Sequence, residues 1–213
     1  MEKMNKYTNL LHSMYKKIGQ DIEVRLKEFE QVWLEANDEI IIRELVFCLF
    51  TPQSKAKSCW DAVGRVCDAD LLLTGSAKEI AKELKGVRFH NTKAARVVEA
   101  RKYLKGFKAR IANFETPFEA REWLVENING MGYKEAGHFL RNIGMGQELA
   151  ILDRHILKNL VLLGVIDEVP RHITKKQYMG IEAKMKIFSD REKIPMAHLD
   201  ILLWYRETGE IFK

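Results

Sequence analysis

Residues 128–146 read INGMGYKEAGHFLRNIGMG, and the spacing of the glycines predicts two helices joined by a tight turn. Gly130 and Gly132 flank a single residue, so the backbone there can take positive φ and no side chain covers the two glycines. The free N–H groups that begin the second helix then face outward, where a phosphate can bind. The same pattern also occurs in ordinary helix–helix turns, so the hairpin alone does not establish a binding site.

Lys134 and Asp153 add reactive groups to this hairpin. Lys134 lies two residues after Gly132, in the first turn of the second helix, where a cation opposes the helix dipole. A lysine amine can form a Schiff base with an aldehydic sugar carbon, although many lysines are simply solvated surface residues. Asp153 follows nineteen positions later and precedes RHILKNLVLLG, so we expect it to cap that helix. A capping carboxylate beside a cleft can also accept a proton or stabilise positive charge on a sugar.

The rest of the chain indicates an all-α protein. Apolar residues recur at helical spacing almost everywhere, which predicts about ten helices, and alternation typical of strands is scarce. Helix starts are expected at Asp38, at Ser54, at Ser76 with Glu79 and at Thr116 with Pro117. Helix ends are expected at Gly19, Gly75, Gly106, Gly164 and Gly209.

The loop over residues 107–115 is the expected lobe boundary. It follows a segment rich in Lys and Arg and precedes a strongly capped helix. We therefore expect one helical lobe over residues 37–114 and a second over residues 1–36 plus 115–213. A central cleft is expected between the two lobes.

Charge and cysteine content narrow the classes of protein to consider. The net charge of +5 in 213 residues suits a partner made of phosphates without requiring one. Cys48, Cys59 and Cys67 are odd in number and widely spaced, which predicts a reduced, cytoplasmic protein. No apolar run reaches the roughly 18 to 20 residues that span a bilayer, so we expect neither membrane insertion nor secretion.

The hairpin INGMGYK, the interval from Lys134 to Asp153 and the LDRHI context resemble the helix-hairpin-helix (HhH-GPD) base-excision DNA glycosylases. The resemblance implies a two-lobed helical fold, with Lys134 as nucleophile and Asp153 as its acidic partner. Members with this lysine are bifunctional glycosylase/AP lyases, and members without it cut only the glycosidic bond. The resemblance also implies DNA contacts by Gly130, Gly132 and Arg154, and a structural monovalent cation held by hairpin carbonyls near residues 127–131. No catalytic metal is implied.

A second segment, LFTPQSKAK over residues 49–57, is similar to a loop of the same family whose glutamine enters the gap left by an extruded base. The resemblance gives this role to Gln53. The residues themselves also fit a simple turn, because Thr51 and Pro52 before Ser54 make a satisfactory turn and helix cap without any ligand.

The choice of base depends on the C-terminal segment IPMAHLDILLWYRETGEIFK. Asp200 and Trp204 lie four residues apart on one helical face, so a carboxylate and an aromatic plane can meet an extruded base in one pocket. A core tryptophan with an exposed aspartate has the same spacing. The chain has no cysteine after Cys67, which excludes the cysteine-ligated iron–sulfur cluster that many relatives carry near the hairpin lobe.

With its terminal Lys213, the chain resembles the second, mainly archaeal and thermophile class of 8-oxoguanine DNA glycosylases over nearly its full length. In that class the terminal lysine and its carboxylate help recognise 8-oxoguanine, which differs from guanine by an N7–H donor and an O8 acceptor. The resemblance also implies Phe89 as a second face of the base sandwich. His138, one helical turn after Lys134, is expected to line the pocket.

The resemblance thus implies a monomeric, nucleoid-associated enzyme that excises 8-oxoguanine from damaged duplex DNA and cleaves the resulting AP site by β-elimination. Two alternatives remain open. One keeps the fold and acts on oxidised pyrimidines, and the other is a non-enzymatic helix-hairpin-helix module that binds DNA.

Overall fold

The computed structural model describes residues 2–213, with side chains from residue 6 onward, and the part it describes is helical without strands. The all-α prediction is confirmed. The helices are α1 (Glu2–Glu35), α2 (Asp38–Phe50), α3 (Ala56–Asp68), α4 (Leu71–Thr74), α5 (Ala77–Glu83), α6 (His90–Ala100), the short 3₁₀ helix η1 (Arg101–Tyr103), α7 (Phe107–Ala112), α8 (Pro117–Asn127), α9 (Tyr133–Asn142), α10 (Arg154–Leu162), α11 (Lys175–Glu192) and α12 (Met196–Thr208). None of these helices has the length and apolar character needed to cross a bilayer.

Two of these four expected helix starts have their predicted caps. Ser76 and Glu79 form a reciprocal capping box at α5, and the Thr116 side chain accepts from the Glu119 backbone N–H at the start of α8. The prediction at α2 was one residue late, because the Asn37 side chain caps this helix. The prediction at α3 was wrong, because the Ser54 hydroxyl is used elsewhere in the fold and Lys55 precedes this helix without a side-chain cap.

Gly19 does not end a helix, because α1 continues through it to residue 35. The ring of Tyr15 lies over this glycine: a Cβ there would be 3.3 Å from the nearest ring carbon. The Tyr15 hydroxyl is also within 3.1 Å of Nδ1 of His198 on α12. Packing against another helix therefore outweighs the low helix propensity of one glycine.

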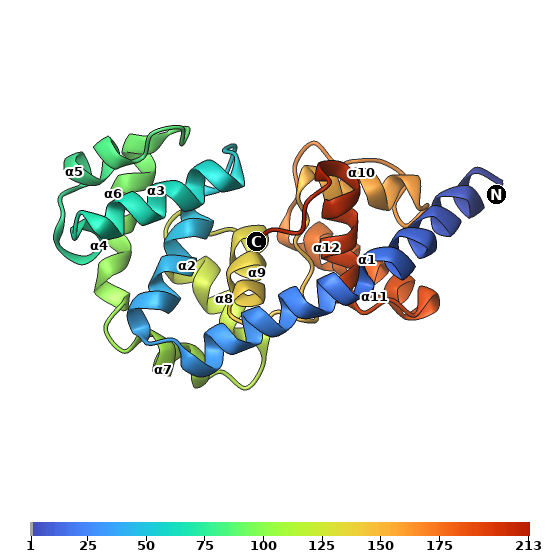
Figure 1. Cartoon of the computed structure of the whole chain (residues 1–213), viewed down its shortest axis with the longest axis horizontal. Coiled ribbons are helices and arrows are strands. Elements are labelled where there is room, and N and C mark those ends of the chain that lie inside the picture. The colour runs from blue at the N-terminus through green and yellow to red at the C-terminus, as the bar shows by residue number, and fades with distance from the viewer. Residues whose placement is uncertain (1) are drawn as a thin grey trace.

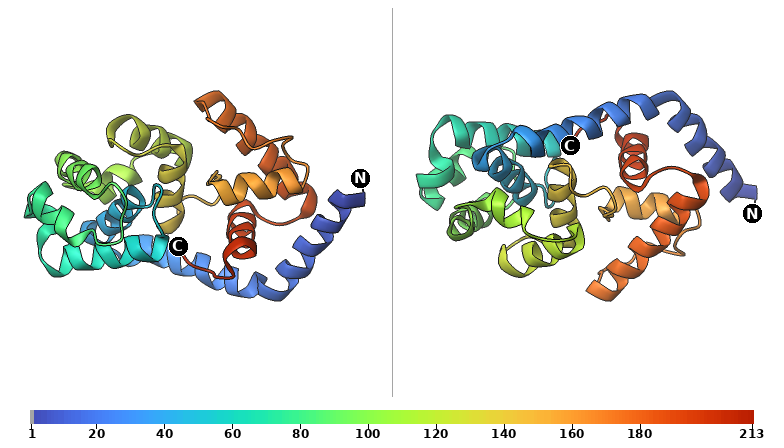
Figure 2. Two further views of the ribbon diagram at one scale, coloured as in Figure 1. Left: turned by 90° about the horizontal axis from the view of Figure 1, so that it is seen from above. Right: turned by 90° about the horizontal axis from the view of Figure 1, so that it is seen from below.

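The buried apolar side chains form two clusters. One contains residues from Ala36 to Leu149 and the other contains residues 11–29 of α1 together with residues 150–203. Figures 1 and 2 show α2 to α9 as one body and α10 to α12 as another, with the long α1 running along both.

This division differs from the lobes expected from sequence. Helix α7 occupies most of the expected boundary loop, and Ala120, Leu124 and Phe139 of α8 and α9 pack in the first cluster. The chain passes between the clusters in the extended segment before α10, and it returns as a C-terminal tail toward α2 and α9 (Figure 1). The hairpin therefore belongs to one body, whereas Asp153 and the C-terminal helix belong to the other.

Candidate active site

The hairpin turn between α8 and α9 is built on Gly130. This glycine has φ +89°, and any Cβ at this position would also clash with the side chain of Arg96 from α6. The Met131 N–H donates to the Ile128 carbonyl at 3.0 Å and closes the turn. Gly132 is extended, with φ −95°, so the expectation of positive φ holds only for the first glycine. The second helix begins at residue 133 with no side-chain cap, as an anion-binding helix terminus requires.

Lys134 lies in the first turn of α9 and faces a cleft between the two bodies. Its side chain is 23% exposed, and its Nζ lies 3.5 Å from the carboxylate of Glu135. One turn later, Gly137 allows α9 to approach the extended segment that leads to Asp153: a Cβ on Gly137 would lie 3.1 Å from the Ala150 carbonyl oxygen. This close approach brings α9, which carries Lys134, beside the segment that leads to Asp153.

Asp153 is the N-cap of α10, as the sequence predicted. Its Oδ1 accepts from the Ile156 backbone N–H at 2.8 Å, and its side chain is only partly buried. Asp153 and Lys134 both line the cleft. The cap fixes one carboxylate oxygen and leaves acceptor capacity on the other for a group in the cleft.

A buried clamp holds the segment that precedes Asp153. The guanidinium of Arg121 on α8 donates to both carboxylate oxygens of Glu182 on α11, at 2.6 and 2.8 Å. Glu182 also accepts from the Ala150 N–H at 2.8 Å, and the Tyr178 hydroxyl donates to the Ala150 carbonyl at 2.7 Å. The backbone three residues before Asp153 is thereby fixed from both bodies.

The cleft has a volume of about 950 Å³ and gathers most of the residues expected from sequence. They come from loops and helices of both bodies: Gln53, Lys134, His138, Asp153, Arg154, Asp200, Trp204 and Lys213. Phe89 does not line the cleft. It lies at the start of α6 with φ +57° and is 54% exposed.

His138 and Asp200 bring buried polar atoms to this cleft. His138 is 7% exposed, and neither ring nitrogen has a hydrogen-bond partner among the described residues. Burial, aided by the positive charges of Arg141 and Lys134, holds the pKa of His138 well below its usual range, so the ring is neutral. The Oδ2 of Asp200 accepts from Arg141 at 2.5 Å, while its buried Oδ1 has no partner in the described structure.

Trp204 supplies the aromatic plane expected in this cleft. It is half-buried, and the ring of His155 meets it edge-on with centroids 5.2 Å apart. Asp200 lies one helical turn earlier in α12 and is more deeply buried. Trp204 and Asp200 therefore both line the same cleft.

Lys213 is held by two residues that the sequence did not reveal. Its ammonium donates to the buried carboxylate of Glu44 on α2 and lies 3.8 Å from the centre of the Trp60 ring. Glu44 also accepts from the amide of Asn142 at 3.1 Å. A single glutamate inside the apolar run of α2 was the only available signal.

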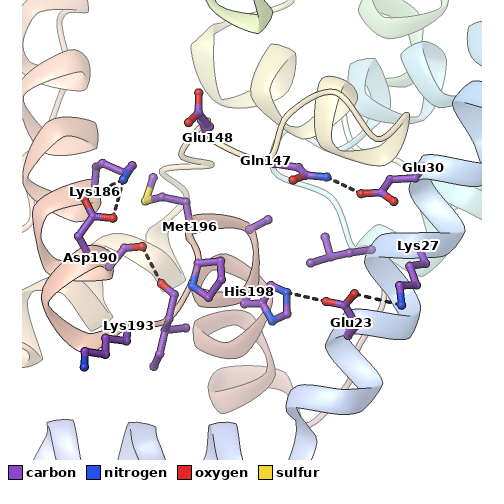
Figure 3. A pocket seen from close by; sticks show the side chains of 15 residues that line it. Glu23, Lys27, Glu30, Gln147, Glu148, Lys186, Asp190, Lys193, Met196 and His198 are labelled. Atoms are coloured by element: carbon purple, nitrogen blue, oxygen red, sulfur yellow. Dashed lines mark hydrogen bonds and ion pairs between the residues drawn. The ribbon is translucent and has the colours of Figure 1, made fainter.

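A second cavity of about 620 Å³ lies between α1 and the start of α12 and shares no lining residue with the cleft (Figure 3). Two ion pairs lie along its lining: His198 lies 3.1 Å from Glu23, and Lys186 contacts Asp190 at 2.5 Å. Among the side chains that the structure describes, no group of three or more His, Cys, Asp or Glu residues is arranged to hold a metal ion.

Comparisons with known proteins agree with this geometry. A family model described as 8-oxoguanine DNA glycosylase matches residues 22–194. The 8-oxoguanine DNA glycosylase/AP lyase of Fusobacterium nucleatum is 47% identical over 99% of this chain and 100% of that protein. The crystal structure of the 8-oxoguanine DNA glycosylase of Thermotoga maritima has a TM-score of 0.90 at 31% identity, covering 99% of this chain and 100% of that one. A Methanocaldococcus jannaschii 8-oxoguanine glycosylase/lyase, in complex with DNA containing 8-oxoguanine, gives a TM-score of 0.90 at 32% identity over 100% of both chains.

Proposed function

The chain belongs to the 8-oxoguanine DNA glycosylase family, and we propose that it excises 8-oxoguanine from duplex DNA and cleaves the AP site that results. The observation that carries the proposal is the meeting of Lys134 and Asp153 in one cleft beside a glycine hairpin. A nucleophilic amine, a carboxylate and an anion-binding turn are the groups that Schiff-base chemistry on a DNA sugar requires.

In this proposal Lys134 attacks C1′ of the extruded nucleotide. A bond forms between Nζ and C1′ as the glycosidic bond breaks, and the base leaves with the bonding electron pair and takes up a proton. Loss of the amine proton and opening of the sugar ring give the Schiff base, with O4′ protonated. Removal of a proton from C2′ then breaks the bond between C3′ and its phosphate oxygen, and hydrolysis of the imine frees Lys134. Asp153 accepts the amine proton or stabilises the positive charge that develops on the sugar.

The base pocket is formed by the groups deeper in the cleft. Trp204 offers a face for stacking, which offsets part of the few kcal/mol that base flipping costs. His138 is neutral and Asp200 has a free oxygen, so both can hydrogen-bond to the base. The terminal carboxylate of Lys213 is the proposed acceptor for the N7–H of 8-oxoguanine. Guanine has an acceptor at that position and would leave the carboxylate unpaired.

The hairpin and nearby loops grip the DNA in this proposal. The N–H groups at the start of α9, after Gly130 and Gly132, bind a backbone phosphate, and Arg154 at the mouth of the cleft binds another. Gln53 fills the gap left by the extruded base. The guanidinium of Arg96 lies across the hairpin turn and adds a cation that sequence reasoning missed. Neutral carbonyl oxygens of the turn fit a monovalent cation that supports the hairpin.

Duplex DNA containing 8-oxoguanine is the proposed partner, bound by a monomer acting on the nucleoid. Single-turnover cleavage of matched duplexes, one with 8-oxoguanine and one with thymine glycol, tests the substrate. We expect faster cleavage of the 8-oxoguanine strand. Faster cleavage of thymine glycol would instead support an enzyme for oxidised pyrimidines, and binding without cleavage of either would support a DNA-binding module.

A further inference from the structure

Lys93 is a buried lysine that the proposed chemistry does not use. It lies on α6, is only 1% exposed, and donates three hydrogen bonds from Nζ. The acceptors are the carbonyls of Phe50 at 2.6 Å and Pro52 at 2.7 Å, and the hydroxyl of Ser54 at 3.0 Å. None of these three acceptors carries a charge, so the ammonium is held by neutral oxygens alone.

The position of these acceptors explains how a buried ammonium is tolerated. Phe50 is the last residue of α2, so Nζ lies at the negative end of that helix dipole. Burial lowers the pKa of Lys93, and three hydrogen bonds at a helix C-terminus favour the charged form again. Lys93 therefore binds the backbone where α2 ends and the next loop begins.

That loop carries Gln53 in a strained conformation. Gln53 has φ +56°, a region that side-chain-bearing residues rarely adopt. The residues on either side of it, Pro52 and Ser54, are the ones whose oxygens accept from Lys93. A strained backbone conformation of this kind persists only where surrounding contacts hold it in place. Such conformations are frequent in functional loops.

The same network reaches a second loop at the cleft. The Ser54 hydroxyl accepts from the Arg88 backbone N–H at 3.0 Å as well as from Lys93. Arg88 and Gln53 both line the cleft. One hydroxyl and one ammonium thus join the loop before α3 to the loop before α6.

We propose that Lys93, with Ser54, is a positioning residue that holds Gln53 and Arg88 as one rigid DNA-contacting wedge. The proposal rests on the gap-filling role given to Gln53 in the proposed function. Lys93 itself touches no DNA. It maintains the backbone conformation from which the Gln53 side chain enters the duplex. The loop is therefore already ordered before DNA binds, and binding does not have to supply that conformational entropy.

The test uses the full chain and a duplex in which an uncleavable abasic analogue lies opposite 2-aminopurine. The fluorescence of 2-aminopurine reports whether a side chain fills the gap, and anisotropy of a dye on the same duplex reports binding. Lys93→Met removes the ammonium, and Ser54→Ala removes the shared acceptor without removing a buried charge. Lys78→Met, at an exposed lysine of α5 outside the cleft lining, is the matched control.

We expect Gln53→Ala to lose the fluorescence change, and Lys93→Met to shift the insertion equilibrium about tenfold toward the open gap. Ser54→Ala should shift it in the same direction, and Lys78→Met should behave as wild type. In the anisotropy measurement, combining Lys93→Met with Gln53→Ala should weaken DNA binding no more than Gln53→Ala alone, because both act through one side chain.

A full fluorescence change in both Lys93→Met and Ser54→Ala would overturn the proposal, and so would losses that add in the double variant. Thermal melting identifies a variant that does not fold, and Ser54→Ala then decides the outcome. Borohydride trapping on 8-oxoguanine DNA is measured in parallel. No trapping by the wild type contradicts the proposed function, whereas normal trapping with undiminished fluorescence changes contradicts only the positioning role.

Discussion

The ammonium of Lys213 donates to the buried carboxylate of Glu44, which lies 169 positions earlier in the chain. The same ammonium lies against the face of Trp60, so the side chain of Lys213 already has two partners. In the proposed function, the group of Lys213 that meets the base is its terminal carboxylate. In that proposal the side chain acts as an anchor, and the carboxylate recognises the base.

Replacing Lys213 by Met should distinguish the role of the ammonium from that of the carboxylate, because the variant keeps the terminal carboxylate and loses the ammonium. We expect a fall of about tenfold in the preference for 8-oxoguanine over guanine, which corresponds to one hydrogen bond. Glu44→Gln should give a similar loss and lower the free energy of unfolding by about 3 kcal/mol, because it breaks a buried charge pair. Single-turnover excision and chemical denaturation measure the two effects.

A C-terminal amide is the matched control for the anchor, since it retains the ammonium and removes the terminal charge. It should also weaken selection of 8-oxoguanine. Unchanged selection in the amidated protein would remove the carboxylate from the site. Additive losses in the Glu44→Gln, Lys213→Met double variant would show that the two residues act separately.

Asp153 has a capping role and a proposed catalytic role that two substitutions can distinguish. Asn caps a helix as well as Asp does, so Asp153→Asn should keep α10 intact while reducing base release far more than DNA binding. Asp153→Ala should lose the cap as well and lower the free energy of unfolding by about 1 kcal/mol. Equal losses of base release and DNA binding in Asp153→Asn would leave only the capping role.

Asp200 should give the excision rate a pH dependence. Burial raises the pKa of Asp200 to about 6, although the neighbouring Arg141 guanidinium favours the carboxylate. A carboxyl group with a raised pKa favours the folded state while protonated, so this contribution to stability is lost as pH rises through about 6. The ionised form is the better acceptor for a base N–H. Excision should therefore increase as pH rises through this range.

Single-turnover rates between about pH 5 and 8 check this prediction. The increase should disappear in Asp200→Asn, which keeps the shape of the side chain and cannot ionise. A rate increase of the same size in Asp200→Asn would assign the titration to another group.

The buried Arg121–Glu182 clamp should contribute strongly to the free energy of unfolding, although neither residue lines the cleft. Arg121→Met leaves Glu182 buried with the Ala150 N–H as its remaining partner, and it should lower the free energy of unfolding by roughly 3 to 5 kcal/mol. Because Ala150 precedes Asp153 by three residues, base release should also fall. A denaturation midpoint equal to that of wild type would show that the clamp contributes nothing.

The positions of Lys134 and Asp153 could be predicted from sequence because each depends on local structure. Gly130 sets the turn, Lys134 follows in the next helical turn, and Asp153 has the residues of a helix cap around it. Such signals lie within a few residues of the position they describe. The C-terminal helix also presents Asp200 and Trp204 to the cleft as their spacing indicated.

Long-range partners could not be predicted. Glu44, Arg141 and Lys93 are buried charged residues, and each depends on partners far along the chain. The resemblance places Phe89 in the base sandwich, whereas in the structure its ring is 54% exposed and does not line the cleft. The division of the core also depends on which helices pack together, a property that local patterns do not contain.

Borohydride reduction in the presence of 8-oxoguanine DNA tests the central claim most directly, because it converts the Schiff base into a stable covalent adduct. Wild type should form the adduct, and Lys134→Gln should form none while still binding the duplex. Lys158→Gln, at an exposed lysine of α10, is the matched control and should be trapped like wild type. A Lys134→Gln protein that is still trapped at the wild-type level would contradict the account, as would a wild-type protein that forms no adduct.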